Sequence, residues 1–334
     1  MDNRPIFIGG IERSGTSLLY ALLASHPNIA MTRRMNLWPY FFHRYGDLNQ
    51  PENRQRCLSV MKQYRRVATI DLDFERLENE LSHGEVDYKR LFTLLWEQYA
   101  EKLGKPRWGD KSLNTERYAD EIFQMYPNAK ILQIIRDPRD RYASALKRWK
   151  VIRGGVGSGT AMWLSSVRIG NRNLRKYPGR YRFVRYETLA QQPEATMREL
   201  CAFLEEEYEP EVLLMQGAEN FRDEGGNSSF EQYEPGIIST RSIGRYRRYL
   251  NSQDIAYIQQ FARREMSAQG YPLDPIDQTL RTRLHYYGVH LPVNLARMVL
   301  WSGREAYFDQ IGRAIPSSRM VHRPEDGVPE MARH

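Results

Sequence analysis

The 334-residue sequence has only two cysteines, no long apolar run and no cluster of metal-binding side chains. Cys57 and Cys201 lie far apart in helix-like sequence, which favours isolated thiols in a reducing compartment. Because no run of about 18 apolar residues occurs, we expect no transmembrane segment. The first apolar strand begins within a few residues of Met1, so we also expect no signal peptide and a cytoplasmic location. Scattered histidines and the lack of a Cys-x-x-Cys motif predict that no metal is bound.

Charge is not scarce, and it is unbalanced: the net charge is +8. This excess favours anionic ligands without naming one. The basic residues form neither a Lys/Arg tail nor an RNA-binding signature, so nucleic-acid binding is the weaker alternative. With 41% hydrophobic residues, the chain is long enough for a large core, as one α/β domain with insertions or as two domains.

The stretch Pro5-Ile-Phe-Ile-Gly-Gly-Ile-Glu-Arg-Ser-Gly-Thr-Ser17 predicts a buried strand, a glycine turn and the start of a helix. The backbone N–H groups of residues 14–17 can converge on an anion at that helix N-terminus. Gly10 and Gly15 have the spacing of a Walker A loop, but Thr16 stands where the lysine belongs. This departure argues against ATP or GTP hydrolysis, and Arg13 could supply the missing charge. The alternative is a structural glycine turn.

A second anion site is predicted after the clearest buried strand, residues 130–135. Pro138 suits the first turn of a helix, so Arg136 lies at the carboxyl end of that strand, where open α/β sheets bind ligands. Ser144 and Arg148 are four residues apart and share a helix face. Lys111, after a short strand, is a further candidate beside the loop. Two anion sites on one sheet imply a ligand with two separated phosphates.

The alternation of strands and helices favours a parallel sheet covered on both faces. Residues 37–105 are predicted to be a helical insertion between the first and second strands, in which aromatic residues are more typical of core than of an acceptor pocket. Residues 221–230 are turn-rich and are predicted to be mobile, and the basic stretch 239–250 that follows is predicted to be a lid over an anion. A basic helical extension, residues 273–316, could dock on the body, on another subunit or on a membrane surface, with the body as the default. Residues 317–334 are predicted to be disordered.

Taken together in this order, five stretches resemble the sulfotransferases that use 3′-phosphoadenosine 5′-phosphosulfate. These stretches are residues 10–17, Lys111, residues 134–144, residues 185–189 and residues 242–249. The resemblance covers about residues 5–272 and is greatest to tyrosylprotein sulfotransferases and their bacterial relatives. It implies a P-loop NTPase-like α/β fold of three layers with a central parallel sheet, and a sulfotransferase domain over residues 1–272.

The resemblance also implies roles for individual residues. The 5′-phosphosulfate would be held by the loop residues Arg13, Ser14, Gly15, Thr16 and Ser17. Arg136 and Ser144 would bind the 3′-phosphate, Tyr186 would wall the nucleotide site, and Arg241 would reach the 3′-phosphate from the lid. Lys111 and Arg13 would stabilise charge on the leaving group during in-line transfer to a hydroxyl, with adenosine 3′,5′-bisphosphate as product.

One stretch departs from the pattern of tyrosylprotein sulfotransferases, which carry a catalytic Glu shortly after the His-Pro turn. Residues 31–36 contain no acid, so a small or carbohydrate-like hydroxyl acceptor is expected more than a tyrosine peptide. The base stays open among four candidates, which are His43, Asp47, Asp71 and Asp110. A homodimer is possible. The alternatives in function are a small-molecule or nucleotide kinase and a non-catalytic nucleotide or nucleic-acid binder.

Overall fold

The computed structural model describes residues 4–149, 154–218, 221–222, 234 and 236–316. Its centre is a five-stranded sheet in the order β2-β3-β1-β4-β5, in which every neighbouring pair is parallel. The strands are β1 (Ile6–Gly9), β2 (Ile29–Arg33), β3 (Arg107–Lys111), β4 (Lys130–Ile135) and β5 (Tyr181–Arg185). The first strand therefore lies in the middle, and its carboxyl end opens between β3 and β4.

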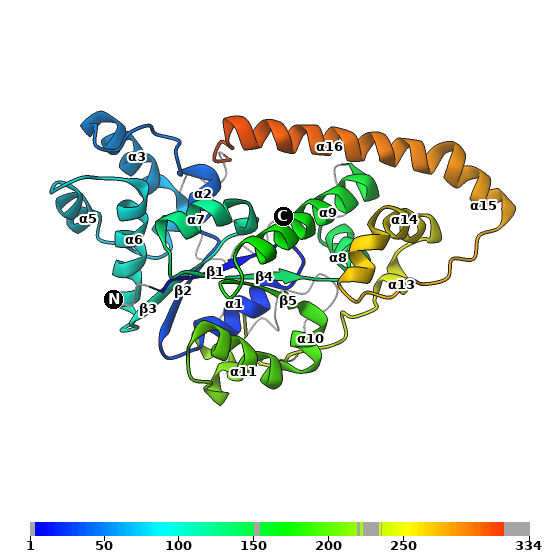
Figure 1. Ribbon diagram of the computed structural model, residues 1–334, viewed down its shortest axis with the longest axis horizontal. Helices are drawn as coiled ribbons and strands as arrows, with labels where there is room; N and C mark the ends of the chain where they lie inside the picture. Colours follow the sequence, from blue (N-terminus) through cyan, green and yellow to red (C-terminus); the bar gives the residue numbers. More distant parts are fainter. Residues whose placement is uncertain (1–3, 150–153, 219–220, 223–233, 235, 317–334) are drawn as a thin grey trace.

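Helices cover both faces of this sheet (Figure 1). One layer contains α1 (Thr16–Ala24), α10 (Tyr186–Gln191) and α11 (Pro193–Leu204), and the other contains α7 (Ala119–Met125), α8 (Pro138–Trp149) and α9 (Gly155–Lys176). Successive side chains of a strand point to opposite faces of the sheet. In β1, Ile6 and Ile8 therefore join the core under α1, whereas Phe7 joins the core on the opposite face. The predicted three-layer α/β fold with a central parallel sheet is confirmed.

The helical insertion is present, but it follows a strand that the sequence analysis did not identify. β2 precedes the insertion, which consists of α2 (Leu37–Tyr40), α3 (Pro51–Gln63), α4 (Arg65–Ala68), α5 (Phe74–Leu81) and α6 (Tyr88–Lys102). Four of the five β2 residues are buried, so the strand shows no alternation of apolar and polar residues. The insertion therefore lies between the second and third strands, and the prediction of its position between the first and second was wrong.

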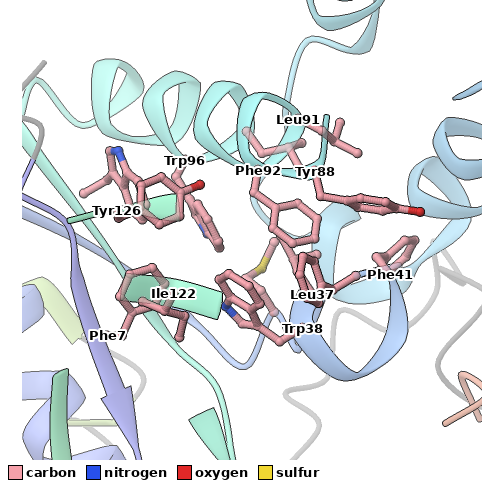
Figure 2. Packing of buried hydrophobic residues seen from close by; sticks show 14 of the residues in the cluster. Phe7, Leu37, Trp38, Phe41, Tyr88, Leu91, Phe92, Trp96, Ile122 and Tyr126 are labelled. Atoms are coloured by element: carbon pink, nitrogen blue, oxygen red, sulfur yellow. The ribbon is translucent and has the colours of Figure 1, made fainter. Parts of the chain in front are cut away.

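Aromatic side chains fill the interface between the insertion and the sheet (Figure 2). Phe7 of β1 meets the rings of Trp38 and Trp96 edge to face, with centroids 6.0 and 5.9 Å apart. Trp96 also stacks on Trp108 of β3 at 4.6 Å. The aromatic residues of α2 thus belong to the core, as expected, and fix the insertion against the strands.

The C-terminal segment packs on the body as a long helix. α14 (Ser252–Ala268) is followed by α15 (Leu280–His285), the π-helical turn η4 (Tyr286–His290) and α16 (Leu291–Ile311), which runs along α9 (Figure 1). A Cβ on Gly157 would come within 2.0 Å of the Asn294 carbonyl oxygen, so glycine is required where α9 and α16 cross. The default expectation of docking on the body is confirmed for this helix.

Some predictions fall outside the described residues. They are the disordered tail, residues 317–334, and most of the turn-rich stretch 221–230. Within the described ranges, no helix combines the length and the apolar character that spanning a membrane requires. Cys57 and Cys201 are buried free thiols, as expected.

Candidate active site

The loop after β1 has a backbone that only glycine adopts easily at two positions. Gly10 has φ 117°, and a Cβ there would come within 2.5 Å of the Ile134 carbonyl oxygen. Gly15 has φ 98°, and a Cβ there would come within 2.3 Å of the Tyr186 ring. The loop is therefore pressed between β4 and Tyr186, and both glycines are required for close approach as well as for their backbone angles.

The loop leads into α1 without a side-chain cap. Gly15 stands at the N-cap position and α1 begins at Thr16, so the amides of the first turn point out of the helix end. The Ser14 amide differs from expectation, because it donates to the Ile11 carbonyl at 3.3 Å. Its hydroxyl is buried and has no hydrogen-bond partner among the described residues. Ser14 would therefore offer an O–H group, and the helix start would offer its amides, to one anion.

The two anion sites expected from the sequence meet through Arg13. Arg13 Nε donates to Ser144 Oγ at 3.0 Å, and Arg136 Nη1 donates to the Arg13 carbonyl at 3.2 Å. Arg136 lies over the Tyr186 ring at 4.6 Å, and its Nη2 donates to the Ser242 carbonyl at 2.6 Å. One continuous cationic surface therefore joins the β1 loop, the β4 end and the segment around Ser242.

This surface is positively charged, although Arg136 also interacts with the carboxylates of Asp140 and Glu187. Burial lowers the pKa of Arg13, and the neighbouring Arg136, Arg148, Arg34 and Arg141 lower it further. Each of these neighbours disfavours a further positive charge, so an anion bound among them would relieve the repulsion. Arg148, which the sequence analysis placed beside Ser144 without a firm role, contributes to this field.

Lys111 is a buried cation at the carboxyl end of β3. Its side chain is 0% exposed, and its Nζ has no hydrogen-bond partner among the described residues. Burial lowers the pKa of Lys111 well below its ordinary value, Arg34, Arg33 and Arg66 lower it further, and Asp110 alone opposes them. A solvated lysine is thereby excluded. Lys111 is opposite Ile8 in the β1–β3 register, close to the start of the loop.

The four candidate bases have different environments. Asp47 and Asp71 are exposed, the first in a turn with Asn49 and the second paired with Lys102 at 2.7 Å. His43 is also exposed and contacts the ring of Phe42 at 4.0 Å between centroids.

Asp110 is the candidate beside Lys111, and it is fully buried. Its two oxygens accept from Thr32 Oγ1 at 2.8 Å and from Ser112 Oγ at 2.9 Å. Burial raises the pKa of Asp110 to about 6, against the effect of these two hydrogen bonds. With both oxygens engaged, Asp110 orders the ends of β2 and β3.

Two acids that hold the site in shape were missed from the sequence. Glu116 is buried, and its Oε2 accepts the Gly10 amide at 2.9 Å while its other oxygen accepts from Ser166 Oγ. Asp140 accepts the amides of Gly244 at 2.7 Å and Tyr246 at 2.8 Å, which fixes the Ser242 segment on α8. No local signal marks either residue, because both bonds join distant parts of the chain.

Arg241 is the one predicted nucleotide ligand whose side chain is exposed. Its carbonyl accepts from Arg245 Nε at 2.9 Å, and its neighbour Ser242 shares a 2.5 Å hydrogen bond with the Tyr186 hydroxyl. The structure thus brings the backbone of this segment to the site, and the reach of the Arg241 guanidinium to a phosphate stays a prediction.

Comparison with known proteins agrees with this geometry. A model of the Sulfotransferase family matches residues 5–210, more than half of the chain. Protein-tyrosine sulfotransferase A of Caenorhabditis elegans is 27% identical over 221 residues, covering 62% of this chain and 51% of its own length. The protein-tyrosine sulfotransferase of Drosophila melanogaster is 26% identical over 213 residues, 62% of this chain and 39% of its own. The chain thus spans about half or less of these relatives.

A solved structure shares the fold. The sulfotransferase domain from the Synechococcus PCC 7002 olefin synthase has a TM-score of 0.58 at 20% identity, covering 81% of this chain and 96% of that domain. The family match agrees with the order of the strands and with the glycine loop at the end of the central strand. The chain belongs to the sulfotransferase family and has its P-loop-like α/β fold.

Proposed function

We propose that the protein transfers a sulfonate group from 3′-phosphoadenosine 5′-phosphosulfate to a hydroxyl acceptor. The observation that carries this proposal is a group of cations, the buried Arg136 and Lys111 and the half-buried Arg13, around a glycine loop that lacks the P-loop lysine. Such a group is costly unless an anion joins it. Membership of the sulfotransferase family supports this donor.

The residues present fit the donor. At the proposed donor site, the buried atoms Ser14 Oγ, Lys111 Nζ and Arg136 Nε have no hydrogen-bond partner among the described residues. Arg13 and residues 14–17 would hold the 5′-phosphosulfate. Arg136 and Ser144 would hold the 3′-phosphate, with Tyr186 as a wall and Arg241 on the exposed side. When bound, the donor supplies a sulfonate on a phosphate leaving group.

The side chains of the protein would position the donor and the acceptor and would stabilise the negative charge that develops on the leaving phosphate. Arg13 is held in place by Ser144, and Lys111 is held by the closely packed end of β3, so neither cation must reorganise when negative charge develops on the leaving phosphate. Binding donor and acceptor together makes the transfer effectively unimolecular. We propose that these side-chain cations take the place that a metal occupies in other phosphate-binding enzymes.

The acceptor is proposed from the segment that follows β2. Residues 31–36 carry Arg33 and Arg34 and no acid, which supports a small or carbohydrate-like hydroxyl acceptor. The names of the relatives support tyrosine in peptides as the second candidate. Labelled donor, offered with sugars, phenols and acidic tyrosine peptides in parallel, separates the two. Turnover confined to the peptides would refute the first choice.

Thermal unfolding with three ligands tests the donor and the alternatives. Adenosine 3′,5′-bisphosphate should raise Tm more than ATP or single-stranded DNA, because a ligand stabilises only through its affinity for the native state. At a hundredfold excess over Kd the gain is about 2.7 kcal/mol. A larger effect of ATP would favour a kinase, and a larger effect of DNA would favour a nucleic-acid binder. Arg198→Ala, which changes an exposed arginine on α11, is the control and should keep the bisphosphate effect.

We also propose that the protein works in a reducing compartment, the cytoplasm. Both cysteines are buried free thiols, and burial raises the pKa of Cys57 to about 12 and of Cys201 to about 11. Such thiols are unreactive and need no oxidising environment. They support the predicted cytoplasmic location.

A further inference from the structure

The segment from α15 to α16 is held to the body by a narrow seam. In α16 the buried residues are Asn294, Trp301 and Glu305, which recur at intervals of seven and four and so lie on one side of the helix. Asn294 faces Gly157 of α9, and Arg297 accepts a hydrogen bond from Ser158 through its carbonyl. One face of α16 thus packs on α9, and the opposite face packs on no other element among the described residues.

That opposite face carries exposed apolar side chains at several turns of the helix. Because an α-helix has 3.6 residues per turn, the exposed hydrophobic side chains of α16 fall in two rows along the side of the helix that faces away from α9. Val299 is 63% exposed and Leu300 73% exposed, in the middle of the helix. The other exposed hydrophobic residues of α16 are Val293, Leu295, Tyr307 and Ile311. A continuous apolar strip of this kind on a surface marks an interaction site.

Charges are sorted across the same helix. Its acids face the body, where Arg117 pairs with Asp309 at 2.8 Å and with Glu305 at 3.6 Å. Arg304 is exposed at the edge of the apolar strip, where it also approaches Glu305 at 3.7 Å, and Arg281 is exposed on α15 next to the exposed Leu280. The outer side of residues 280–311 therefore combines apolar side chains with positive charge.

A second copy of the chain fits this surface poorly. A helix of 21 residues is about 31 Å long. A strip about 10 Å wide on it offers about 300 Å² per copy, well below the 800 Å² per partner typical of specific complexes. A two-fold contact would also bring the arginine-bearing edges together, and Glu305, the acid that Arg304 approaches at 3.7 Å, is only 10% exposed.

An anionic lipid bilayer matches both properties of this surface, its apolar side chains and its positive charge. Acyl chains accept the apolar strip without shape complementarity, and negatively charged headgroups pair with the flanking arginines. We propose that the outer face of α16, together with α15, docks the protein on an anionic membrane surface, with the helix lying parallel to the bilayer. This site is separate from the nucleotide loop and does not depend on the proposed function.

Vesicle co-sedimentation of the full chain tests the proposal. Binding is expected to vesicles of equal parts phosphatidylglycerol and phosphatidylcholine, and to be weak to phosphatidylcholine alone. The double variant Val299→Glu/Leu300→Glu should lose at least about tenfold in affinity, since two aliphatic side chains would no longer be buried in the bilayer. Arg281→Gln/Arg304→Gln should lose about 25-fold on the mixed vesicles, at about fivefold for each arginine. Leu214→Glu, at a residue 52% exposed in the layer of α1, is the apolar control.

A matched charge control is Arg182→Gln/Arg198→Gln, which removes two exposed arginines far from α16. All variants should keep the parent circular dichroism and the parent affinity for adenosine 3′,5′-bisphosphate, because the changed side chains are exposed. Equal loss in the control and in the α16 variants would overturn the proposal. So would a stable dimer in light scattering that becomes a monomer in Val299→Glu/Leu300→Glu without any vesicle binding, which would assign the strip to a second copy.

Discussion

Replacing Lys111 by methionine should make the ligand-free protein more stable and the enzyme much slower. Methionine fills a similar volume without a charge, and the site it enters is fully buried beside the core residue Ile8. The parent protein buries the Lys111 amine with no hydrogen-bond partner among the described residues, and burial lowers its pKa well below the ordinary value, so folding costs free energy whether the amine keeps or loses its proton. The variant removes that cost along with the charge that we propose acts on the leaving group.

The size of both effects follows from this environment. Apolar replacement of buried charges commonly stabilises proteins by about 1–4 kcal/mol, which would raise Tm by several degrees. Removing a preorganised charge from a water-poor site lowers turnover by about a hundredfold or more. Affinity for the bisphosphate should change little if Lys111 acts on charge that develops only in the transition state.

The pH dependence has a definite sign. Burial, reinforced by Arg34 and Arg33, holds the folded-state pKa of Lys111 well below its unfolded value. Between these two pKa values the unfolded chain binds more protons, so the parent gains stability as pH rises through this window. Lys111→Met lacks this gain. Its stability advantage should therefore be largest below the folded-state pKa and should shrink toward the unfolded pKa.

Urea unfolding across a pH series, calorimetry with the bisphosphate and a labelled-donor assay measure the three effects. Lys111→Arg is the control that keeps a positive charge and should not gain stability. The reasoning is refuted if Lys111→Met turns over within a few-fold of the parent. A variant that is less stable than the parent at every pH would refute the account of an uncompensated buried charge.

Three further changes probe the loop and its supports. Gly15→Ala should destabilise the protein by about 2–5 kcal/mol in urea unfolding, combining a left-handed backbone cost of about 1–2 with overpacking against Tyr186 of about 1–3. Arg136→Ala should weaken adenosine 3′,5′-bisphosphate by about tenfold to a hundredfold more than adenosine 5′-phosphate in calorimetry, because it removes a charged donor to the 3′-phosphate. Glu116→Ala should cost about 1–3 kcal/mol of unfolding free energy by leaving the Gly10 amide without its acceptor, and should weaken the bisphosphate as well.

Each of these has its own control. Gly179→Ala changes a glycine with φ 72° and no atom within 4 Å of the added Cβ, so it separates backbone strain from the contact with Tyr186. Equal losses for both nucleotides in Arg136→Ala would mean that this residue does not read the 3′-phosphate. A Glu116→Ala protein with unchanged bisphosphate affinity would show that the loop keeps its shape without that acid.

The parts of the site that could be predicted are those that depend on residues close together in the sequence. A short apolar strand, a glycine turn and a helix start fixed the loop around Gly15, and the same logic placed Arg136 at the end of β4. The missing lysine was equally visible, because it depends on one position in a known spacing. These features need only a few neighbouring residues to be recognised.

The parts that were missed depend on contacts between distant residues. The Glu116 carboxylate meets the Gly10 amide across 106 positions, and Arg13 meets Ser144 across 131, which merges two sites that the sequence presented as separate. β2 was missed because four successive buried residues after a turn have no alternation, and only pairing with β3 makes them a strand. The sorting of exposed hydrophobic side chains on α16 required knowing which side α9 covers.

The position of β1 in the middle of the sheet also sets when the loop can form during synthesis. Its neighbours are β3 and β4, so both partners of Ile6 to Gly9 emerge about a hundred residues later. At ribosomal rates of about 5–20 residues per second, the first strand waits on the order of ten seconds without a pairing partner. Its apolar side chains and unpaired backbone groups are thus exposed to other chains and to chaperones for longer than those of any other strand of the sheet. The loop that we propose binds phosphate follows β1, so its supports on β3 and β4 are complete only after these later strands have been made.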